Sequence, residues 1–352
     1  MVVHLFPQEK FTVPFIKFIN STFNVNEHLF IVHGKNDNYK KYEVEQYNNI
    51  IYVNRDNKNN IIEVIKYINK ADKVIIHSLF IPNWLKYYLL ISKTTLKKSN
   101  WVIWGADLYL YKIRNKNLKS DLNEVIRRRI ISNLGGLITH IKGDYELAKE
   151  WYGAKGKYVY SFMYPSNLYN DYNLPKSNIN NNGTIYIQIG NSADPTNNHL
   201  DIFKKLENYL DKNIKIICPL SYGDEDYKNK VINEGKRIFG NKFSPLLNFM
   251  NSEEYLEILS KIDVAIFNHK RQQAVGNITS LLGFGKKVYI RSDITTWEFC
   301  KAHDLTVFDA TTSSNDLLTP LDLNDNVKNI ESVKKYFSKE KLILDLQEIF
   351  KN

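Results

Sequence analysis

Two polar stretches in the second half of the sequence carry residue types that bind phosphate. The first runs from Gly190 to His199 and the second from His269 to Asn277. Each follows a short apolar run and precedes an amphipathic stretch, so each is predicted to join a strand to a helix. The free N–H groups and the dipole at a helix N-terminus attract anions. The two stretches are therefore predicted to bind the diphosphate of a nucleotide.

In the first stretch a glycine allows a tight turn, and small polar residues leave backbone N–H groups exposed. His199 is expected to add a hydrogen-bond donor to a diphosphate oxygen. The alternative is an ordinary capped helix start, with Asp194 or Asn197 as the N-cap, but capping needs only one such residue. The candidate donor-binding residues here are Gly190, Asn191, Ser192, Asp194, Asn197 and His199.

In the second stretch Arg271 offers a forked guanidinium that suits phosphate. Gln272 and Gln273 could bond sugar hydroxyls or an acetamido group. The alternative is a solvated basic loop, which would explain the charges but not the glutamines or the Gly-Asn pair. Tyr222, after another apolar run, could pack on a nucleotide base. The candidates added are Tyr222, Arg271, Gln272, Gln273, Gly276 and Asn277.

Two residues of the first half are candidates for catalysis. Asp107 follows a strand-like run and a Gly-Ala turn, where its carboxylate could take a proton from an acceptor hydroxyl. A helix N-cap role for Asp107 is equally open. His77 ends another strand-like run and is the second candidate, although a single histidine is more often structural.

The elements that must position these residues repeat along the chain. Short β-branched runs separated by helix-like stretches predict parallel sheets covered on both faces. The fold class is therefore α/β, in the form of two Rossmann-like doubly wound domains that face a central cleft. The strand-like runs are 2–6, 28–33, 50–53, 73–77, 100–104, 136–141, 157–161, 184–189, 214–218, 264–268, 287–290 and 305–308.

The domain boundaries follow from breaks in this pattern. Residues 1–165 are predicted to form an acceptor-binding domain and residues 184–328 a domain that binds the donor nucleotide. An Asn-rich linker with proline separates them at 166–183. A closing helix is expected at 329–352.

Charge is distributed unevenly between the two halves. Residues 1–170 contain 25 Lys and Arg against 14 Asp and Glu, whereas residues 171–352 contain 23 against 24. The basic half is therefore expected to face an anionic partner, such as a phospholipid surface, a phosphorylated substrate or nucleic acid. The aromatic helix-like stretch Trp84–Leu90 and the arginines Arg127–Arg129 favour an anionic membrane surface.

Other features narrow the class of protein. With 43% hydrophobic and 24% charged residues, the chain is expected to be globular. Its two cysteines, Cys218 and Cys300, suit a reducing compartment, and no Cys or His cluster has the spacing of metal ligands. The first residues do not resemble a signal peptide, and no apolar run approaches the roughly 20 residues of a membrane span.

The ordered series of these clusters resembles glycosyltransferase family 56, the 4-acetamido-4,6-dideoxygalactose transferases of enterobacterial common antigen synthesis. The residues that carry the resemblance are Trp104–Tyr109, Gly190–Ser192 with Asp194, Asn197 and His199, and Arg271–Gln273 with Gly276; weaker agreement includes His77, Gly143-Asp144 and Tyr255-Leu256. The resemblance implies a GT-B enzyme without metal or other cofactor. It also implies a dTDP-linked amino-dideoxy sugar donor and an undecaprenyl-diphosphate-linked glycan acceptor, used peripherally at the cytoplasmic face of the inner membrane. The insert-like region 36–60 departs from the family pattern.

The sequence thus predicts glycosyl transfer from a nucleotide-sugar to a lipid-carried glycan. One rival is an epimerase that works on the free sugar-nucleotide and needs no basic acceptor domain. The other is a basic nucleic-acid-binding protein. That rival would require aromatic and basic residues interleaved on one surface, whereas the sharpest polar clusters lie in the near-neutral half, so no nucleic-acid partner is expected.

Overall fold

The structure of the chain is a computed structural model that describes residues 1–34, 47–53, 59–115, 117–169, 183–312 and 316–351. Most of the predicted linker 166–183 and much of the insert-like region 36–60 lie outside these residues. The chain divides into two compact units. One comprises Met1–Leu168 with Lys339–Asn352, and the other comprises Tyr169–Ser338.

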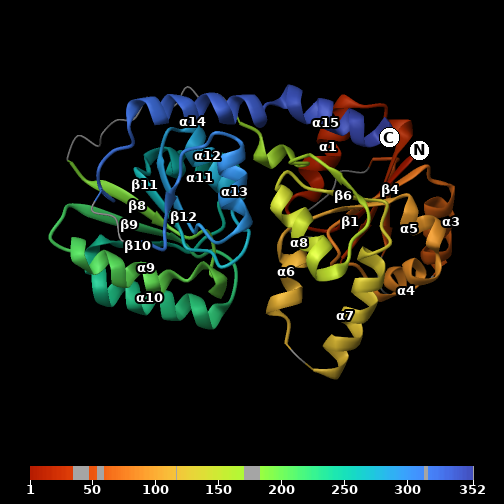
Figure 1. Ribbon diagram of the computed structural model, residues 1–352, viewed down its shortest axis with the longest axis horizontal. Coiled ribbons are helices and arrows are strands. Elements are labelled where there is room, and N and C mark those ends of the chain that lie inside the picture. The colour runs from red at the N-terminus through yellow and green to blue at the C-terminus, as the bar shows by residue number, and fades with distance from the viewer. Residues whose placement is uncertain (35–46, 54–58, 116, 170–182, 313–315, 352) are drawn as a thin grey trace. The chain divides into compact units, whose positions relative to one another are not determined.

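The first unit contains a seven-stranded parallel sheet in the order β3-β2-β1-β4-β5-β6-β7 (Figure 1). All seven strands coincide with the predicted runs to within a few residues. Their bounds are β1 Val2–Pro7, β2 His28–His33, β3 Ile50–Val53, β4 Lys73–His77, β5 Ser99–Val102, β6 Gly136–Ile138 and β7 Lys157–Val159.

Helices cover both faces of this sheet, because alternate residues of a strand point to opposite sides. Val3 and Leu5 belong to a core cluster with residues of α3, α4, α7 and α8. His4 lies on the other face, where its ring contacts Phe15 of α1 and Phe350 of α15. The helices are α1 Thr12–Thr22, α3 Asn59–Lys70, α4 Asn83–Ile91, α5 Lys93–Lys97, α6 Ala106–Ile113, α7 Leu118–Ile131, α8 Lys142–Tyr152 and α15 Lys339–Lys351.

A chain of buried polar rings crosses the α1 face of the sheet. His4 lies 3.1 Å from His28 and 3.2 Å from His77 between ring nitrogens. The other nitrogen of His77 lies 2.8 Å from the hydroxyl of Tyr164, which accepts a hydrogen bond of 2.7 Å from the Trp104 indole. Because an indole N–H only donates, it orients the Tyr164 hydroxyl as a donor to His77. One set of neutral tautomers then satisfies the whole chain.

The second unit contains a six-stranded parallel sheet in the order β10-β9-β8-β11-β12-β13. Strand β10 was not predicted, since Pro245 interrupts its short run; a proline in the interior of a strand is found mainly in edge strands such as this one. The bounds are β8 Ile185–Ile189, β9 Ile214–Pro219, β10 Phe243–Leu246, β11 Val264–Phe267, β12 Lys287–Ile290 and β13 Phe308–Asp309.

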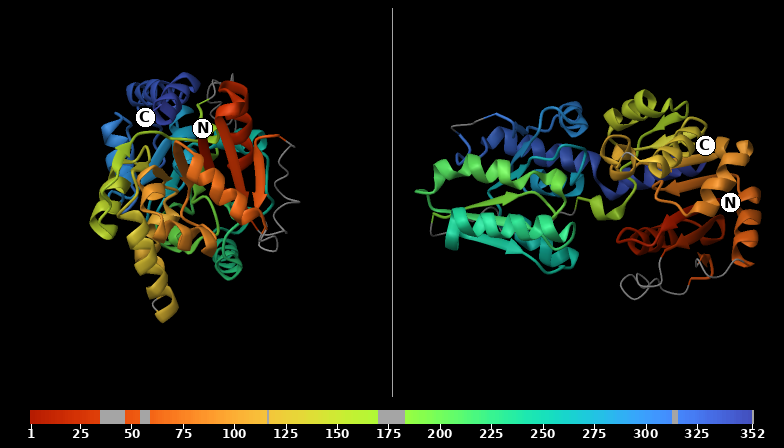
Figure 2. Two further views of the ribbon diagram at one scale, coloured as in Figure 1. Left: turned by 90° about the vertical axis from the view of Figure 1, so that its right-hand side faces the viewer. Right: turned by 90° about the horizontal axis from the view of Figure 1, so that it is seen from below.

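The helices of the second unit also lie in two layers. Figure 1 shows α9 and α10 on one side of the sheet and α11 to α14 on the other, and Figure 2 gives two further views. This division follows from the reversal of strand order after β10. The bounds are α9 His199–Leu206, α10 Glu225–Phe239, α11 Ser252–Lys261, α12 Val275–Gly283, α13 Thr295–Ala302 and α14 Leu323–Tyr336.

The C-terminal segment, predicted as one helix over 329–352, consists of two helices. Helix α14 ends at Tyr336 and belongs to the second unit, whereas α15 begins at Lys339 and belongs to the first. The apolar face of each helix packs in its own unit. Val333 is a buried residue of α14, and Leu342 and Leu346 are buried residues of α15. The sequence pattern shows both apolar faces but not the break between them.

The buried histidines predict a loss of stability in mild acid. Burial lowers the pKa of His28 to about 4, and it lowers the pKa of His4 and of His77 well below the usual value. The unfolded chain therefore binds protons more readily than the folded chain. The free energy of unfolding should be fully retained above a pH of about 6.5 and should fall as the pH drops from there toward about 4.

Urea titrations at about pH 7 and about pH 5 check this expectation, since carboxylates titrate mostly below that window. We expect a lower unfolding midpoint at the lower pH. Equal midpoints would contradict the burial of neutral histidines.

Candidate functional site

The strand order of the second unit reverses between β8 and β11, which are hydrogen-bonded neighbours. The chain leaves β8 toward β9 on one side, whereas β11 leads to β12 on the other. The loops that follow two such strands enclose a crevice in which open α/β sheets bind ligands. Both polar stretches selected from the sequence are these loops. The Lys270 N–H donates to the Thr196 carbonyl at 3.1 Å and joins them.

The first loop is held in a turn that requires glycine. Gly190 has a φ of +65°, and a Cβ there would lie 2.5 Å from Nε2 of His199 and 2.7 Å from Oδ1 of Asn197. The same Asn197 oxygen accepts the backbone N–H of Asn191 at 2.9 Å and lies 2.9 Å from Nε2 of His269. The buried amide of Asn197 therefore fixes the path of the loop.

His199 has a structural role in this turn. Its side chain has no exposed surface, and burial lowers its pKa to about 4, so the ring is neutral near pH 7. Its Nδ1 lies 3.3 Å from the hydroxyl of Tyr227, and its Nε2 faces Gly190. Because Nε2 is buried and has no hydrogen-bond partner among the described residues, the expected hydrogen bond from His199 to a diphosphate stays a prediction.

Side chains of the two loops form one hydrogen-bonded network. Gln273 donates to Oδ1 of Asn191 at 3.1 Å and accepts from the hydroxyl of Thr196 at 3.0 Å. Asn191 in turn donates to the hydroxyl of Tyr222 at 3.0 Å, from the loop after β9. Gln273 also lies 3.4 Å from the hydroxyl of Ser192. Predicted residues from three separate segments thus meet at one edge of the sheet.

Arg271 is the buried cation of the network. Its side chain donates to Asp194 at 2.9 Å and to the carbonyl of Gln272 at 3.2 Å. Burial alone would raise the pKa of Asp194, but hydrogen bonds from Thr196 and the charge of Arg271 lower it, so Asp194 stays ionised. Nε of Arg271 is buried and has no hydrogen-bond partner among the described residues. One edge of the guanidinium is therefore left for a ligand.

The two helices that follow the loops begin differently from their neighbours. Helices α10 and α11 are capped by the side chains of Asp224 and Asn251. Within the described residues, no side chain caps α9 or α12, whose N-caps Asn198 and Ala274 are left-handed, with φ of +55° and +60°. Asp194, considered as the cap of the helix, instead caps the short 3-10 turn Pro195–Asn197. The first N–H groups of α12 are thus available to an anion.

The remaining predicted residues lie on the first turn of α12. Gly276 and Asn277 are its second and third residues, and the Asn277 amide donates to the hydroxyl of Tyr255 at 3.0 Å. The same hydroxyl lies 3.4 Å from Nε2 of Gln188. Gln188, a fully buried polar residue in an apolar strand, was not selected from the sequence, although its polarity there was a usable signal.

Two further residues of the site were also missed. Thr196 and His269 lie inside the selected stretches, and both make hydrogen bonds that close the network. Burial, with a smaller contribution from Arg271, lowers the pKa of His269 to about 3. His269 directly follows β11, which is the position where such residues are expected.

In the first unit, Asp107 joins two loops rather than facing solvent. Oδ1 accepts the backbone N–H of Trp104 at 2.9 Å and of Leu108 at 3.0 Å. Oδ2 accepts the backbone N–H of Leu79 at 2.9 Å and the indole of Trp101 at 2.8 Å. Because the side chain has no exposed surface and both oxygens are occupied, the geometry argues against Asp107 as the base and favours a positioning role.

His77 is similarly enclosed. His77 is the last residue of β4, and its side chain has no exposed surface. Its ring lies between His4 and Tyr164 and stacks on the ring of Phe6, with 3.8 Å between the ring centroids. The next residue, Ser78, has a φ of +69°, a strained conformation for a residue with a side chain. The loop after β4 is therefore fixed at two points, by the hydrogen bond from Leu79 to Asp107 and by His77 in the chain of buried polar rings.

Two structural features are absent from the described residues. They contain no group of three or more His, Cys, Asp or Glu side chains that could hold a metal ion. No helix among them is long and apolar enough to cross a membrane.

Comparison with known families gives one match that spans most of the chain. The family described as 4-alpha-L-fucosyltransferase, glycosyl transferase group 56, matches residues 7–328. Both selected loops and Asp107 lie within the matched range.

Comparison with solved structures shows the fold. Sucrose-phosphate synthase from Thermosynechococcus elongatus superposes with a TM-score of 0.70 at 11% identity over 100% of this chain and 98% of that one. Anabaena HepE in complex with UDP-glucose gives 0.68 at 11% identity over 99% and 98%. WaaG, a glycosyltransferase involved in lipopolysaccharide biosynthesis, gives 0.63 at 11% identity over 99% and 98%. The two parallel-sheet units are therefore those of the GT-B fold, as predicted.

The turn at Gly190 can be tested with alanine. Gly190→Ala places a methyl group against His199 and Asn197, so we expect a loss of about 2–5 kcal/mol of unfolding free energy from strain and overpacking. Gly153→Ala is the matched control, because Gly153 has a φ of +66° and no atom within 4 Å of its Cβ position. It should cost only the left-handed strain, about 1–2 kcal/mol. Urea titration measures both, and equal losses would contradict the contact with His199.

The role of Asp107 can be tested with Asp107→Asn. The amide replaces one acceptor oxygen with a donor that faces buried N–H groups, so the free energy of unfolding should fall by about 1–3 kcal/mol. Asp121→Asn, at an exposed carboxylate paired with Arg114, should change it by at most about 1 kcal/mol. If Asp107→Asn keeps full stability yet loses all turnover, a catalytic role for Asp107 is restored.

Proposed function

The chain belongs to the family described as 4-alpha-L-fucosyltransferase, glycosyl transferase group 56, and we propose that it transfers an amino-dideoxy sugar from a dTDP-sugar to a glycan on undecaprenyl diphosphate. That the protein is a glycosyltransferase follows from the family and the GT-B fold. The donor, the acceptor and the residues that act on them are the proposed part. An epimerase of free sugar-nucleotides is disfavoured by the same family match.

The observation that carries the donor site is the unsatisfied edge of Arg271 beside an uncapped helix. Nε of Arg271 is buried without a partner among the described residues, and α12 begins two loop residues after Gln272. A diphosphate bound here would pair with the guanidinium and accept N–H groups of the helix. The same groups would stabilise the charge that develops on the leaving diphosphate as the glycosidic bond to it breaks.

The sugar and the base have candidate partners in the same network. Oε1 of Gln272 is buried and has no hydrogen-bond partner among the described residues, so it can accept the N–H of an acetamido group or a sugar hydroxyl. The ring of Tyr222 is 45% exposed although Asn191 holds its hydroxyl. An exposed ring held at one end suits stacking on a nucleotide base.

The first unit has properties that suit a lipid-carried acceptor. The excess of basic residues lies in residues 1–170. Large apolar side chains are exposed on the same unit, among them Tyr87 and Ile91 on α4 and Leu118 and Leu122 on α7. Exposed apolar residues beside basic ones favour contact with an anionic lipid surface. We therefore propose peripheral binding at the cytoplasmic face of the inner membrane.

The donor site is tested by replacing the guanidinium of Arg271, which can donate two parallel hydrogen bonds, with the ammonium of lysine. Arg271→Lys should weaken dTDP binding by about ten- to a hundredfold, because a charged hydrogen-bond pair is worth about 1.5–3 kcal/mol. Arg237→Lys is the matched control, since Arg237 is exposed on α10 and paired with Glu234. Calorimetric titration with dTDP, UDP and GDP measures both variants.

Unchanged dTDP affinity in Arg271→Lys would remove Arg271 from the diphosphate site. Tighter binding of GDP than of dTDP by the wild-type protein would instead overturn the dTDP donor while leaving the diphosphate site intact.

A further inference from the structure

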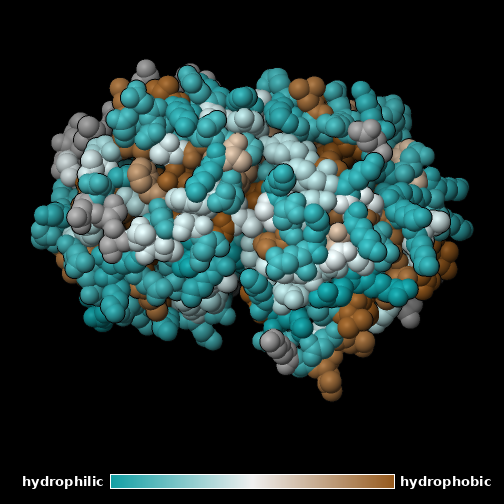
Figure 3. Space-filling view, viewed as in Figure 1, coloured by the Kyte–Doolittle hydropathy of each residue, from teal (hydrophilic) through white to brown (hydrophobic). Residues whose placement is uncertain are grey.

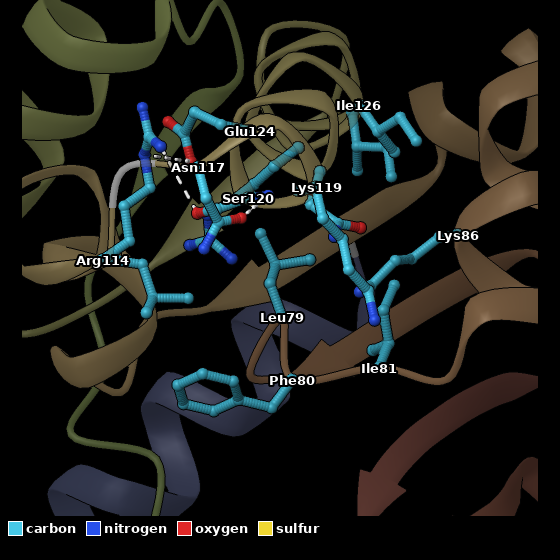
Figure 4. Close-up of a pocket in the computed structure, with 14 residues that line it drawn as sticks. Leu79, Phe80, Ile81, Lys86, Arg114, Asn117, Lys119, Ser120, Glu124 and Ile126 are labelled. Carbon is cyan, nitrogen blue, oxygen red and sulfur yellow. Dashed lines mark hydrogen bonds and ion pairs between the residues drawn. The ribbon is translucent and has the colours of Figure 1, made fainter.

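A cavity in the first unit lies apart from the residues assigned above. Its volume is about 540 Å³, within the range of about 300–1,000 Å³ in which proteins hold small molecules. Its walls come from the loop after β4 and from α4, α6 and α7 (Figure 4). Strand order in this unit reverses between β1 and β4, so the cavity adjoins the loop where a ligand of this unit is expected.

The walls of the cavity are largely apolar. Leu79 and Ile81 line it from the loop, Leu110 from α6, and Ile126 and Ile130 from α7. The loop is fixed in place because the backbone N–H of Leu79 is bound by Asp107. A preformed apolar wall of this kind favours a hydrocarbon group over water.

The charges at the cavity are unbalanced. Arg114 is neutralised, since it pairs with Asp121 and lies 3.9 Å from Glu124. Lys86 and Lys119 also line the cavity, and neither forms an ion pair with a described residue. In Figure 4, Arg114 and Glu124 lie on one side of Leu79 and the two lysines lie on the other. The lysine side therefore carries positive charge without a protein counter-ion.

A further cation lines the cavity. Arg127 lines the cavity and donates to the carbonyl of Asp107 and to the hydroxyl of Tyr152, which are both uncharged partners. Burial, and secondly the charge of Arg127, lowers the pKa of Lys86. Two cations close enough to affect each other at one cavity favour binding of an anion.

Helix α7 also carries exposed apolar side chains on a face that does not line the cavity. On α7, Leu118 is 91% exposed, and Leu122 and Val125 are exposed by about two thirds of their area. Figure 3 shows apolar residues gathered over the projecting end of this helix. A helix that lines a cationic cavity with one face and exposes apolar side chains on another suits contact with a membrane.

We propose that this cavity binds a single-chain lipid phosphate, with the start of its hydrocarbon chain against the apolar walls and its phosphate at Lys86 and Lys119. The assignment rests on the proposed function, in which the acceptor glycan is carried by a lipid of this chemistry. A bilayer phospholipid fits less well, because its glycerol separates the phosphate from two chains, whereas here cations and apolar walls line one cavity.

The test compares two double variants that remove the same charge from the first unit. Lys86→Gln with Lys119→Gln removes the cavity lysines. Arg128→Gln with Arg129→Gln removes two exposed charges of α7 that do not line the cavity. Binding of the full chain is measured by sedimentation with three phosphatidylcholine vesicles: undoped, doped with polyprenyl phosphate, or doped with phosphatidylglycerol at matched charge.

We expect the wild-type protein to prefer polyprenyl phosphate vesicles over charge-matched phosphatidylglycerol vesicles. The cavity variant should lose about tenfold or more in affinity for the former and should no longer distinguish the two. The Arg128 and Arg129 variant should bind both more weakly and keep the preference. Equal wild-type binding to both vesicles, or an equal loss of preference in both variants, would overturn the proposal.

Transfer to a water-soluble acceptor without a lipid chain separates this proposal from the proposed function. Cavity variants should keep normal turnover with that acceptor. If the wild-type protein transfers no sugar to any acceptor, the proposed function fails, while the vesicle preference still decides the lipid site.

Discussion

The reversal of strand order between β8 and β11 is the constraint on which the candidate donor site depends. Because the chain leaves these neighbouring strands in opposite directions, the loops after them must supply their own hydrogen bonds at the edge of the sheet. Many of these hydrogen bonds form within the loops, through the side chains of Asn197, Gln273 and Asp194. Several groups stay without a hydrogen-bond partner among the described residues, and two of them are the Nε edge of Arg271 and the first N–H groups of α12. Both are donors, so their complement is an anion.

The strand order of the first unit also reverses, between β1 and β4, but the polar groups there are arranged differently. Its buried polar groups near the reversal satisfy one another, through four N–H groups on Asp107 and through the ring chain from Trp104 to His28. Such a network rigidifies loops instead of binding a ligand. Cations without an ion-pair partner among the described residues lie further out, at Lys86, Lys119 and Arg127 on the cavity. The two units therefore differ in where each leaves polar groups unsatisfied, although both are doubly wound parallel sheets.

Apolar runs separated by helix-like stretches predicted the fold class and nearly every strand, because a parallel strand covered on both faces is nearly continuously apolar. The apolar pattern did not predict β10, an edge strand that contains Pro245. It also did not predict the break between α14 and α15, because the apolar residues of the two helices form one continuous helical pattern although they pack in different units. At the candidate site, spacing selected the two loops that meet where the strand order reverses. It could not show that His199 packs inside the turn or that Asp107 is saturated with donors, since burial and hydrogen-bond partners arise only from tertiary contacts. Gln188 and His269 were detectable as polar residues within or directly after apolar strands.

We propose that the candidate donor site and the cavity of the first unit bind the two substrates of one reaction, in which a sugar passes from a dTDP-linked donor to a lipid-carried acceptor. The most direct measurement incubates the protein with a dTDP-linked 4-acetamido-4,6-dideoxyhexose and an undecaprenyl-diphosphate-linked glycan, and follows both products by mass spectrometry. The account predicts that free dTDP appears in equal amount with a lipid whose mass has increased by one sugar residue. Conversion of the dTDP-sugar to an isomer without release of dTDP, or no reaction with the acceptor present, would contradict it.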